Sequence, residues 1–457
     1  MCEPATLRKW IVYRQHMTSP DIALAVVGTA YHTPSPEALE VLADVVISVD
    51  AAGIIVAVVP QHSPDATDLL AAAATVRHLT PSQRLLPGLV DLHIHAPQWP
   101  QLGTGLDLPL ERWLFEYTFP LEARYADEGF AREVWAHMVP ALLAHGTTTA
   151  VYFASVHEPA TLALAEQCVR SGQRAFVGRV AMDHPDGTPD WYRDATAADG
   201  IAASRRSIDA IRALGGPLVQ PIVTPRFVPA CTDELLRGLG ELAAETGALV
   251  QTHCSESDWE HGAVLQRYGV TDTHALQSMG LLREGTVLAH GNHLGDDDLA
   301  TIRAAHAGVA HCPLSNVYFA NAVLPVRHIM EAGVKLGLGT DIAGGAEPGL
   351  LHQCAIAVDS SQVLHEHGVP ESRIDVVRAF HLGTAGGADV LGLDVGRFQV
   401  GQQFDAIVVD TGSAGSPGSA LRAWDGIDDH DRVFEKIVRL ARPADIDTVW
   451  VSGRAVG

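Results

Sequence analysis

The chain has 457 residues, of which 47% are apolar and only 19% charged, and its formal net charge is −23. This acidic balance argues against a nucleic-acid-binding protein, which needs a clustered basic face, and no apolar stretch approaches the ~18–20 residues of a membrane span. A chain of this length and composition suits one α/β barrel with an accessory module, acting on a small, neutral ligand.

The N-terminal region carries no sign of a targeting segment. Residues 1–10 lack a basic stretch that leads into an apolar one, so we expect no signal peptide, and we assign no role to residues 1–24. The six cysteines lie far apart and form no CxxC pair, which indicates reduced thiols in a cytoplasmic protein.

Strand-like segments occur near both ends of the chain. Residues 44–59 resemble two strands around the turn Asp50–Gly53, a pattern typical of a hairpin. Residues 404–410 and 448–453 are strand-like as well. We expect the two ends to meet and build one small composite β-sandwich.

Eight short apolar runs, separated by segments of helical periodicity, fill the centre of the chain. The runs are Leu89–His93, Thr147–Phe153, Ala175–Met182, Leu218–Thr224, Leu249–His253, Thr286–His290, Gly308–Cys312 and Lys335–Thr340. Continuously apolar strands that alternate with helices indicate a parallel sheet buried on both faces, and eight such units indicate a closed (β/α)₈ TIM-like barrel. An open doubly wound sheet is less favoured, because no GxGxxG follows the first run. The three predicted parts are residues 1–86, 87–391 and 392–457.

A long interval separates the first predicted barrel strand from the second. It contains Trp99–Gly105 and then the aromatic-rich segment Glu111–Tyr125. Loops of this length in a barrel usually form lids or specificity elements, so we expect this one to cover the mouth.

Potential metal ligands stand at the ends of four of the predicted strands. They are His93, His95, His253, His290 and Asp341. The carboxyl ends of barrel strands open into one mouth, and two residues two apart on a strand point to the same face. Imidazole and carboxylate ligands suit a divalent metal such as zinc. Any one of the 23 histidines could be ordinary, but this repetition predicts metal-dependent hydrolysis.

Two acidic residues are candidates for proton transfer. Glu256 follows His253 closely, so its carboxylate could reach a ligand without binding the metal, as a general acid or base does. An alternative is that Glu256 is a helix N-cap or an acid in a first helical turn. Asp341 precedes the turn-forming segment Ile342–Gly345, and it could bind the metal, accept a proton from the attacking water, or both.

Several strings together resemble the amidohydrolase superfamily. They are Pro87-Gly88-Leu89-Val90-Asp91-Leu92-His93-Ile94-His95, Thr252-His253-Cys254-Ser255-Glu256, Ala289-His290-Gly291, His311-Cys312-Pro313-Leu314-Ser315-Asn316 and Gly337-Leu338-Gly339-Thr340-Asp341. Within the superfamily the chain resembles the guanine deaminases, from about Ala25 to the C-terminus. The segments that carry this second likeness are His95–Gln98, Leu106–Leu110, Tyr117–Pro120, Thr224–Phe227 and Thr340–Gly345.

The resemblance implies a set of roles for residues of this chain. It implies that one zinc ion is bound by His93, His95, His253 and Asp341, and that His290 contacts the attacking water or the substrate. It implies a purine site lined by Gln98, Arg226, Phe227, Glu256 and Asp341. Pro97 departs from the family pattern, where a small polar residue is more usual. The resemblance also implies a homodimer.

The implied reaction is the zinc-dependent hydrolysis of guanine to xanthine and ammonia. Arg226 would donate to the acceptors O6 and N7, while Gln98 could donate to O6 and accept from N1–H. Zinc would supply a hydroxide for attack at C2, with Glu256 protonating N3 and Asp341 taking the hydroxide proton. The sequence leaves open a deaminase of a related ring, such as 8-oxoguanine, a pterin or an amino-s-triazine like ammeline, and a non-catalytic scaffold of the same fold.

Overall fold

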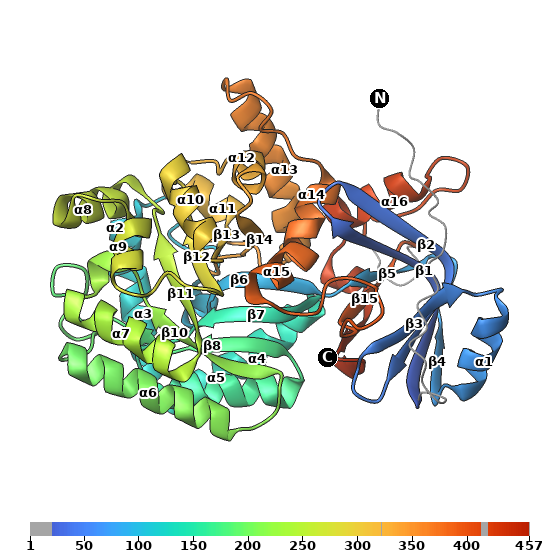
Figure 1. Cartoon of the computed structure of the whole chain (residues 1–457), viewed down its shortest axis with the longest axis horizontal. Coiled ribbons are helices and arrows are strands. Elements are labelled where there is room, and N and C mark those ends of the chain that lie inside the picture. Colours follow the sequence, from blue (N-terminus) through green and yellow to red (C-terminus); the bar gives the residue numbers. More distant parts are fainter. Residues whose placement is uncertain (1–20, 321, 413–418, 457) are drawn as a thin grey trace.

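Two β-sheets organise the molecule, and they lie side by side along its long axis (Figure 1). The computed structural model describes residues 21–456 apart from 321 and 413–418, so the segment 1–20 lies outside the described residues. Within the described part of the chain, no helix is both long enough and apolar enough to cross a membrane.

The predicted α/β barrel is confirmed. Its strands run in the order β14-β13-β12-β11-β10-β8-β7-β6, with the short β9 added beside β10, and every neighbouring pair is parallel. The strands are β6 (Leu89–His95), β7 (Thr147–Phe153), β8 (Arg174–Gly178), β9 (Val180–Ala181), β10 (Val219–Pro225), β11 (Leu249–Cys254), β12 (Thr286–His290), β13 (Gly308–His311) and β14 (Lys335–Leu338).

The barrel closes just beyond the end of β14, between that strand and β6. The Asp341 N–H donates to the His93 carbonyl at 2.9 Å, and the His95 N–H donates to the Ile342 carbonyl at 2.9 Å. The same contacts bring β6, which carries His93 and His95, next to Asp341 at the barrel mouth.

One predicted strand is shorter than expected. The run 175–182 is interrupted at Arg179, which separates β8 from β9. The Arg179 guanidinium donates to the Val156 carbonyl and pairs with Asp194, and β9 then continues alongside β10. The contacts of Arg179 with residues outside the sheet therefore accompany the early end of β8.

Helices cover the outside of the barrel, and most follow a strand as the βα pattern predicts. The main ones are α4 (Glu128–Ala144), α5 (Glu158–Ser171), α6 (Ala197–Ala213), α7 (Asp233–Thr246), α8 (Asp258–Tyr268), α9 (Asp272–Ser278), α10 (Asp296–Ala304), α12 (Val326–Glu331), α13 (Leu350–Glu366), α14 (Val376–His381) and α15 (Gly387–Leu391). The sequence determines the limits of α7 directly: the Thr232 hydroxyl caps its first turn, and Gly247 ends it with a left-handed φ of 68°.

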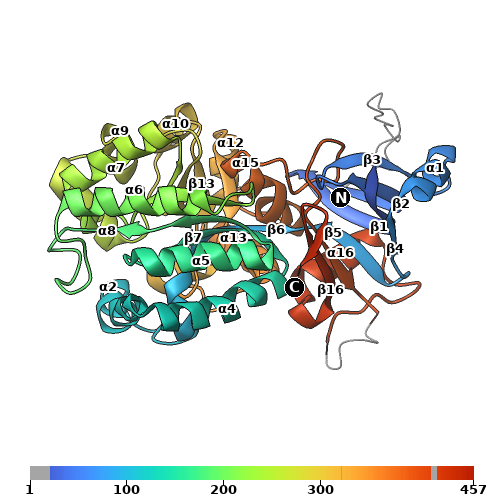
Figure 2. The same cartoon turned by 90° about the horizontal axis from the view of Figure 1, so that it is seen from below.

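The long interval after β6 folds into short helical segments over the barrel mouth. They are η1 (Ala96–Gln101), α2 (Leu110–Trp113), η2 (Leu114–Thr118), α3 (Phe119–Ala123) and η3 (Arg124–Ala126). The Gln101 amide donates to the Thr118 hydroxyl at 3.0 Å, and the Trp113 indole donates to the Thr104 carbonyl at 3.1 Å. Figure 2 shows α2 at the end of the barrel away from the terminal sheet.

The two ends of the chain build a second unit together, as predicted. Its strands form one connected sheet in the order β17-β16-β15-β5-β1-β2-β3, and β4 pairs with β1. They are β1 (Ile22–Ser35), β2 (Ala38–Asp50), β3 (Ile55–Pro60), β4 (Thr75–His78), β5 (Gln83–Pro87), β15 (Ala406–Asp410), β16 (Ile446–Val451) and β17 (Arg454–Val456). The helix α1 (Pro64–Ala72) packs on β1 and β3, whereas α16 (His430–Leu440) packs on α13 and α14 and reaches β1 through Phe434 and Tyr31. Val26, Ile47, Leu85, Val408 and Trp450 share one buried core, so strands from both termini stabilise the same unit.

Candidate active site

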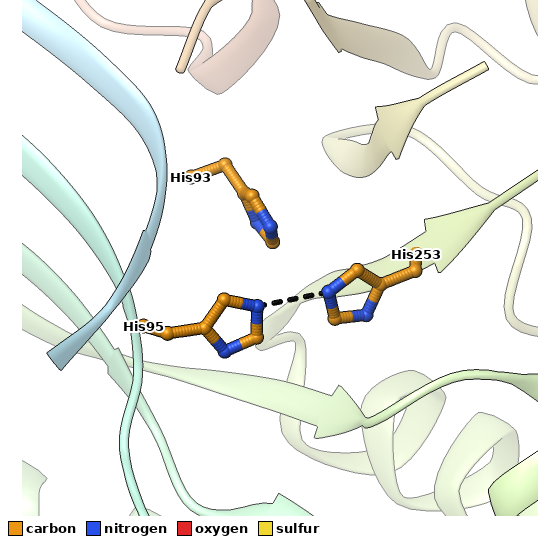
Figure 3. Close-up of side chains that lie close together, drawn as sticks. All are labelled: His93, His95 and His253. Carbon is orange, nitrogen blue, oxygen red and sulfur yellow. Dashed lines mark hydrogen bonds between the residues drawn. The ribbon is translucent and has the colours of Figure 1, made fainter. Parts of the chain in front are cut away.

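Three imidazoles point toward one another inside the barrel mouth (Figure 3). His93 and His95 leave the same face of β6, and His253 lies on β11. The His95 and His253 Nε2 atoms are 2.9 Å apart, and one ring nitrogen from each of the three residues lies within 4.8 Å of the others. The predicted convergence of residues far apart in sequence is therefore present.

The surroundings keep these imidazoles neutral. Burial, and after it the neighbouring histidines, holds the pKa of His93, His95 and His253 well below the usual value. His253 Nδ1 lies 2.6 Å from the Arg226 carbonyl, so Nδ1–H donates there and the lone pair of Nε2 stays free. Both ring nitrogens of His93 are buried without a hydrogen-bond partner. Free nitrogen lone pairs on neutral, converging imidazoles are what a divalent metal requires, so the residues present fit such an ion.

Asp341 faces this cluster from just beyond β14. Its Oδ1 lies 3.1 Å from His93 Nε2 and 3.6 Å from His95 Nε2, and its Oδ2 lies 3.9 Å from His290 Nε2. Burial raises the pKa of Asp341 against the opposing influence of His290. Asp341 and His290 both have a positive φ, 49° and 73°, which is uncommon for non-glycine residues.

Glu256 also lies near His290. Its Oε1 is 3.7 Å from His290 Nε2, and burial followed by the charge of Asp341 raises the pKa of Glu256 well above the usual range. The helix α8 begins at Asp258 with Ser257 as its N-cap, so Glu256 is neither a cap nor a first-turn acid.

Two side chains hold the backbone of Glu256 in place. Its N–H donates to Glu260 Oε2 at 2.7 Å, and its carbonyl accepts from the Asn292 amide at 2.8 Å. His290 is oriented in a similar way, because its Nδ1 lies 2.9 Å from Asn316 Oδ1. Neither Glu260 nor Asn316 was assigned a role from the sequence.

Two of the predicted purine-binding residues, Arg226 and Gln98, form a polar wall of the cavity, and both are held by a residue that the sequence did not single out, Glu122. Arg226 is buried, and its Nη1 and Nη2 donate to Glu122 Oε2 and Oε1 at 2.6 and 3.1 Å. Gln98 Nε2 donates to Glu122 Oε1 at 2.9 Å, while Gln98 Oε1 accepts from the Ala343 N–H at 3.1 Å. The amide oxygen of Gln98 thus already has a donor, a constraint that the sequence did not reveal.

Apolar residues line the cavity as well. Phe227 packs near His253 and Trp259, with ring centroids 6.1 and 5.8 Å apart, and Trp113 packs on Phe319 at 5.0 Å. The cavity is lined by His95, Gln98, Leu110, Trp113, Leu114, Arg226, Phe227, His253, Glu256, Glu260, Phe319, Asp341 and Gly344. The lid segment therefore contributes to the site, whereas His93 and His290 are absent from the cavity lining.

Asp91 supports the cluster from within β6. Its carboxylate accepts from the Thr340 N–H at 3.0 Å, the Thr340 hydroxyl at 2.6 Å and the His93 N–H at 3.2 Å. Burial raises the pKa of Asp91 to about 7. An acidic residue inside an otherwise apolar run is the signal in the sequence that could have identified it.

Comparison with known proteins agrees with this geometry. Residues 84–456 match the model of the amidohydrolase family. The chain is 40% identical to the guanine deaminase of Dictyostelium discoideum over 81% of this chain and 82% of that protein. It is 36% identical to the guanine deaminase of Homo sapiens over 96% of this chain and 97% of that protein.

A solved structure is similar over nearly the whole chain. The guanine deaminase from C. acetobutylicum, with guanine bound in its active site, superposes with a TM-score of 0.86 and 28% identity, covering 95% of this chain and 99% of that one. The resemblance predicted from the motifs is confirmed, and the chain belongs to the amidohydrolase family.

Proposed function

We propose that this protein is a zinc-dependent guanine deaminase that hydrolyses guanine to xanthine and ammonia. The observation that carries the proposal is one cavity with two faces: a cluster of neutral imidazoles with Asp341 and Glu256, and a wall of hydrogen-bond donors from Arg226 and Gln98. The identity to guanine deaminases over most of the chain supports the same reaction.

His93, His95, His253 and Asp341 would hold one zinc ion. When bound, zinc lowers the pKa of a water molecule toward neutrality and so makes a nucleophile available. The absence of hydrogen-bond partners for both ring nitrogens of His93 supports this assignment, because a buried imidazole is otherwise satisfied.

Glu256 and Asp341 would move the protons. The raised pKa of Glu256 favours its protonated form, so the carboxyl would donate to N3 while water attacks C2. Asp341 takes one proton from that water and passes it to the amino group, which leaves as ammonia. The proton of the new C2 hydroxyl returns to Glu256 as the carbonyl of xanthine forms. His290, near both carboxylates, would orient the attacking water.

Ring recognition would come from the polar wall. Arg226 and Gln98 would donate to the acceptor edge of the purine, and Phe227 would pack against the ring. Rings that share the amidine carbon, including 8-oxoguanine, pterins and ammeline, are the competing substrates.

A substrate panel tests the proposal. Zinc-loaded protein is mixed with guanine, 8-oxoguanine, a pterin and ammeline, ammonia release is followed, and the guanine product is compared with xanthine by chromatography. We expect guanine to have the highest kcat/KM. A higher value for another ring would overturn the substrate assignment, and ammonia release by a His93→Ala control would point to a contaminating enzyme.

We also propose a cytoplasmic homodimer. The five cysteines among the described residues are buried and unpaired, which supports a reducing compartment. The dimer rests on the family resemblance, and light scattering on purified protein would check it: a mass near 48.6 kDa, that of one chain, would contradict it.

A further inference from the structure

Glu122 joins the two residues that would recognise the ring. This carboxylate lies on α3, in the lid segment, and it is 1% exposed. It accepts two hydrogen bonds from Arg226 and one from Gln98. We infer that Glu122 is a specificity-determining positioning residue, which fixes Arg226 and Gln98 as a pair of donors and thereby restricts the cavity to rings with an oxo group at C6. The inference deepens the proposed deaminase function and rests on it.

The amide of Gln98 is oriented from both of its ends. An ionised carboxylate only accepts hydrogen bonds, so the Gln98 atom that faces Glu122 is the NH₂ group. The Ala343 N–H only donates, so the atom that faces it is the amide oxygen. The Nε2 hydrogen that Glu122 does not engage is then available to a ligand, and Gln98 offers the ring a donor.

Arg226 is fixed as firmly. Its two terminal nitrogens engage both carboxylate oxygens of Glu122, and its guanidinium lies 4.9 Å from the centroid of Phe119, which is on the same short helix. A guanidinium has no acceptor. Arg226 and Gln98 therefore present only hydrogen-bond donors to the cavity. The Glu122 carboxylate, which holds both side chains in these orientations, lies behind them.

This arrangement selects between two rings with the same leaving group. Guanine and 2,6-diaminopurine both carry an amino group at C2, but C6 bears an acceptor in guanine and a donor in 2,6-diaminopurine. The donors of Arg226 and Gln98 can hydrogen-bond to the oxo group of guanine, but they face another donor in 2,6-diaminopurine. Sites that hydrogen-bond a substrate group strongly reject an analogue that lacks the matching group. If Glu122 were neutral, the Gln98 amide could rotate and offer its oxygen to the 6-amino group.

A purely structural role for Glu122 is the competing interpretation, because buried ion pairs also anchor loops. A second pair in this chain provides the matched control. Arg174 and Asp405 are 3% and 2% exposed and form two hydrogen bonds of 3.1 and 3.2 Å, at the junction of the barrel with the terminal sheet. Asp405→Asn neutralises an equally buried carboxylate outside the cavity.

The test compares kcat/KM for guanine and 2,6-diaminopurine in the zinc-loaded wild type, Glu122→Gln and Asp405→Asn. We expect Glu122→Gln to lower the preference for guanine by at least about tenfold, with KM for guanine changing more than kcat and with zinc content unchanged. Asp405→Asn should lower Tm and leave the preference within about twofold of wild type.

A double-mutant cycle shows whether Glu122 acts through its partner. In an Arg226→Ala or a Gln98→Ala background, Glu122→Gln should have a smaller effect on the preference than in the wild type, because one of the two donors that it positions is gone. Should Glu122→Gln not fold, Glu122→Asp keeps the charge on a shorter side chain and is expected to lower the preference by a smaller factor.

The two proposals fail in different ways. Wild-type protein without guanine activity would overturn the proposed function. Wild-type activity on guanine, together with an unchanged preference in whichever Glu122 variant folds, would overturn the inference alone.

Discussion

Removing Arg226 should affect folding and catalysis by separate, measurable amounts. In Arg226→Ala the Glu122 carboxylate stays buried and loses both hydrogen bonds from Arg226, while it keeps the one from Gln98. Breaking a buried ion pair from one side costs about 3–5 kcal/mol, because an uncompensated charge remains. We therefore expect a free energy of unfolding lowered by that amount in denaturant titrations.

The catalytic loss is worked out from the hydrogen bond to the ring. A hydrogen bond from a charged donor is worth about 1.5–3 kcal/mol, and every ~1.4 kcal/mol corresponds to a factor of ten. Arg226→Ala should lower kcat/KM for guanine at least about tenfold, measured as ammonia release at sub-saturating guanine.

The double variant Arg226→Ala/Glu122→Gln separates the two losses. Neutralising Glu122 removes the unpaired charge, so stability should recover in part, while kcat/KM for guanine stays low because the donor is still absent. An Arg226→Ala single variant with the wild-type free energy of unfolding and the wild-type kcat/KM for guanine would refute both parts of the reasoning.

Three further predictions concern the metal cluster and its supports. His93→Ala or His253→Ala should lose both zinc and activity, so zinc retained at about one per chain by elemental analysis would contradict the ligand assignment. Glu256→Gln should keep zinc and lower kcat on the order of a hundredfold or more, the usual contribution of a proton-transfer group; near-normal turnover would mean that another group carries the proton. Asp91→Ala leaves the buried donors of Thr340 and His93 unpaired, which should lower the free energy of unfolding by about 2–3 kcal/mol and weaken zinc binding by about 10–100-fold in competition with a chelator. Unchanged zinc affinity in that variant would assign Asp91 to barrel closure alone.

The sequence predicted the barrel well because its strands follow from local patterns. Thr147–Phe153 and Thr286–His290 have the bounds that the apolar runs indicated, and the spacing of His93 and His95 on one strand placed both side chains on the same face. The alternation of strands and helices then determines that strand ends share one mouth. Local periodicity was sufficient for these features.

The strand β1 was not predicted, although it is the longest of the terminal sheet. Its partners come from three places: β2 along most of its length, β4 beside residues 24–27, and β5 at Ala30. The pairing with β2 is a local hairpin, since Ser35 pairs with Ala38, but β4 and β5 are separated from β1 in the sequence and become its neighbours only in the folded chain.

Glu260 shows how a local motif can suggest the wrong partner. Ser257-Asp258-Trp259-Glu260 has the spacing of a capping box, in which the glutamate would bind the N–H of the N-cap serine. In the structure Ser257 does cap the Glu260 N–H, but the Glu260 carboxylate takes the N–H of Glu256, one residue earlier. The difference of one position turns a helix signal into a support for the proposed proton donor.

The division of labour in the site follows from where each part is built. The residues that would hold the metal lie on or next to barrel strands. Substitutions there should abolish zinc binding and with it the activity on every substrate ring. The donor wall comes from segments that meet only at the mouth: Gln98 after β6, Glu122 on α3, Arg226 after β10 and Ala343 after β14. None of these contacts belongs to a strand ladder, and an isolated glutamate in a lid is usually solvated. Ring preference should therefore be changeable by substitutions in the lid, as at Glu122, without loss of zinc, because the lid supplies part of the polar wall and none of the residues that would hold the metal. The loops after β10 and β14 serve both parts, since the Arg226 carbonyl orients His253 and Asp341 follows β14.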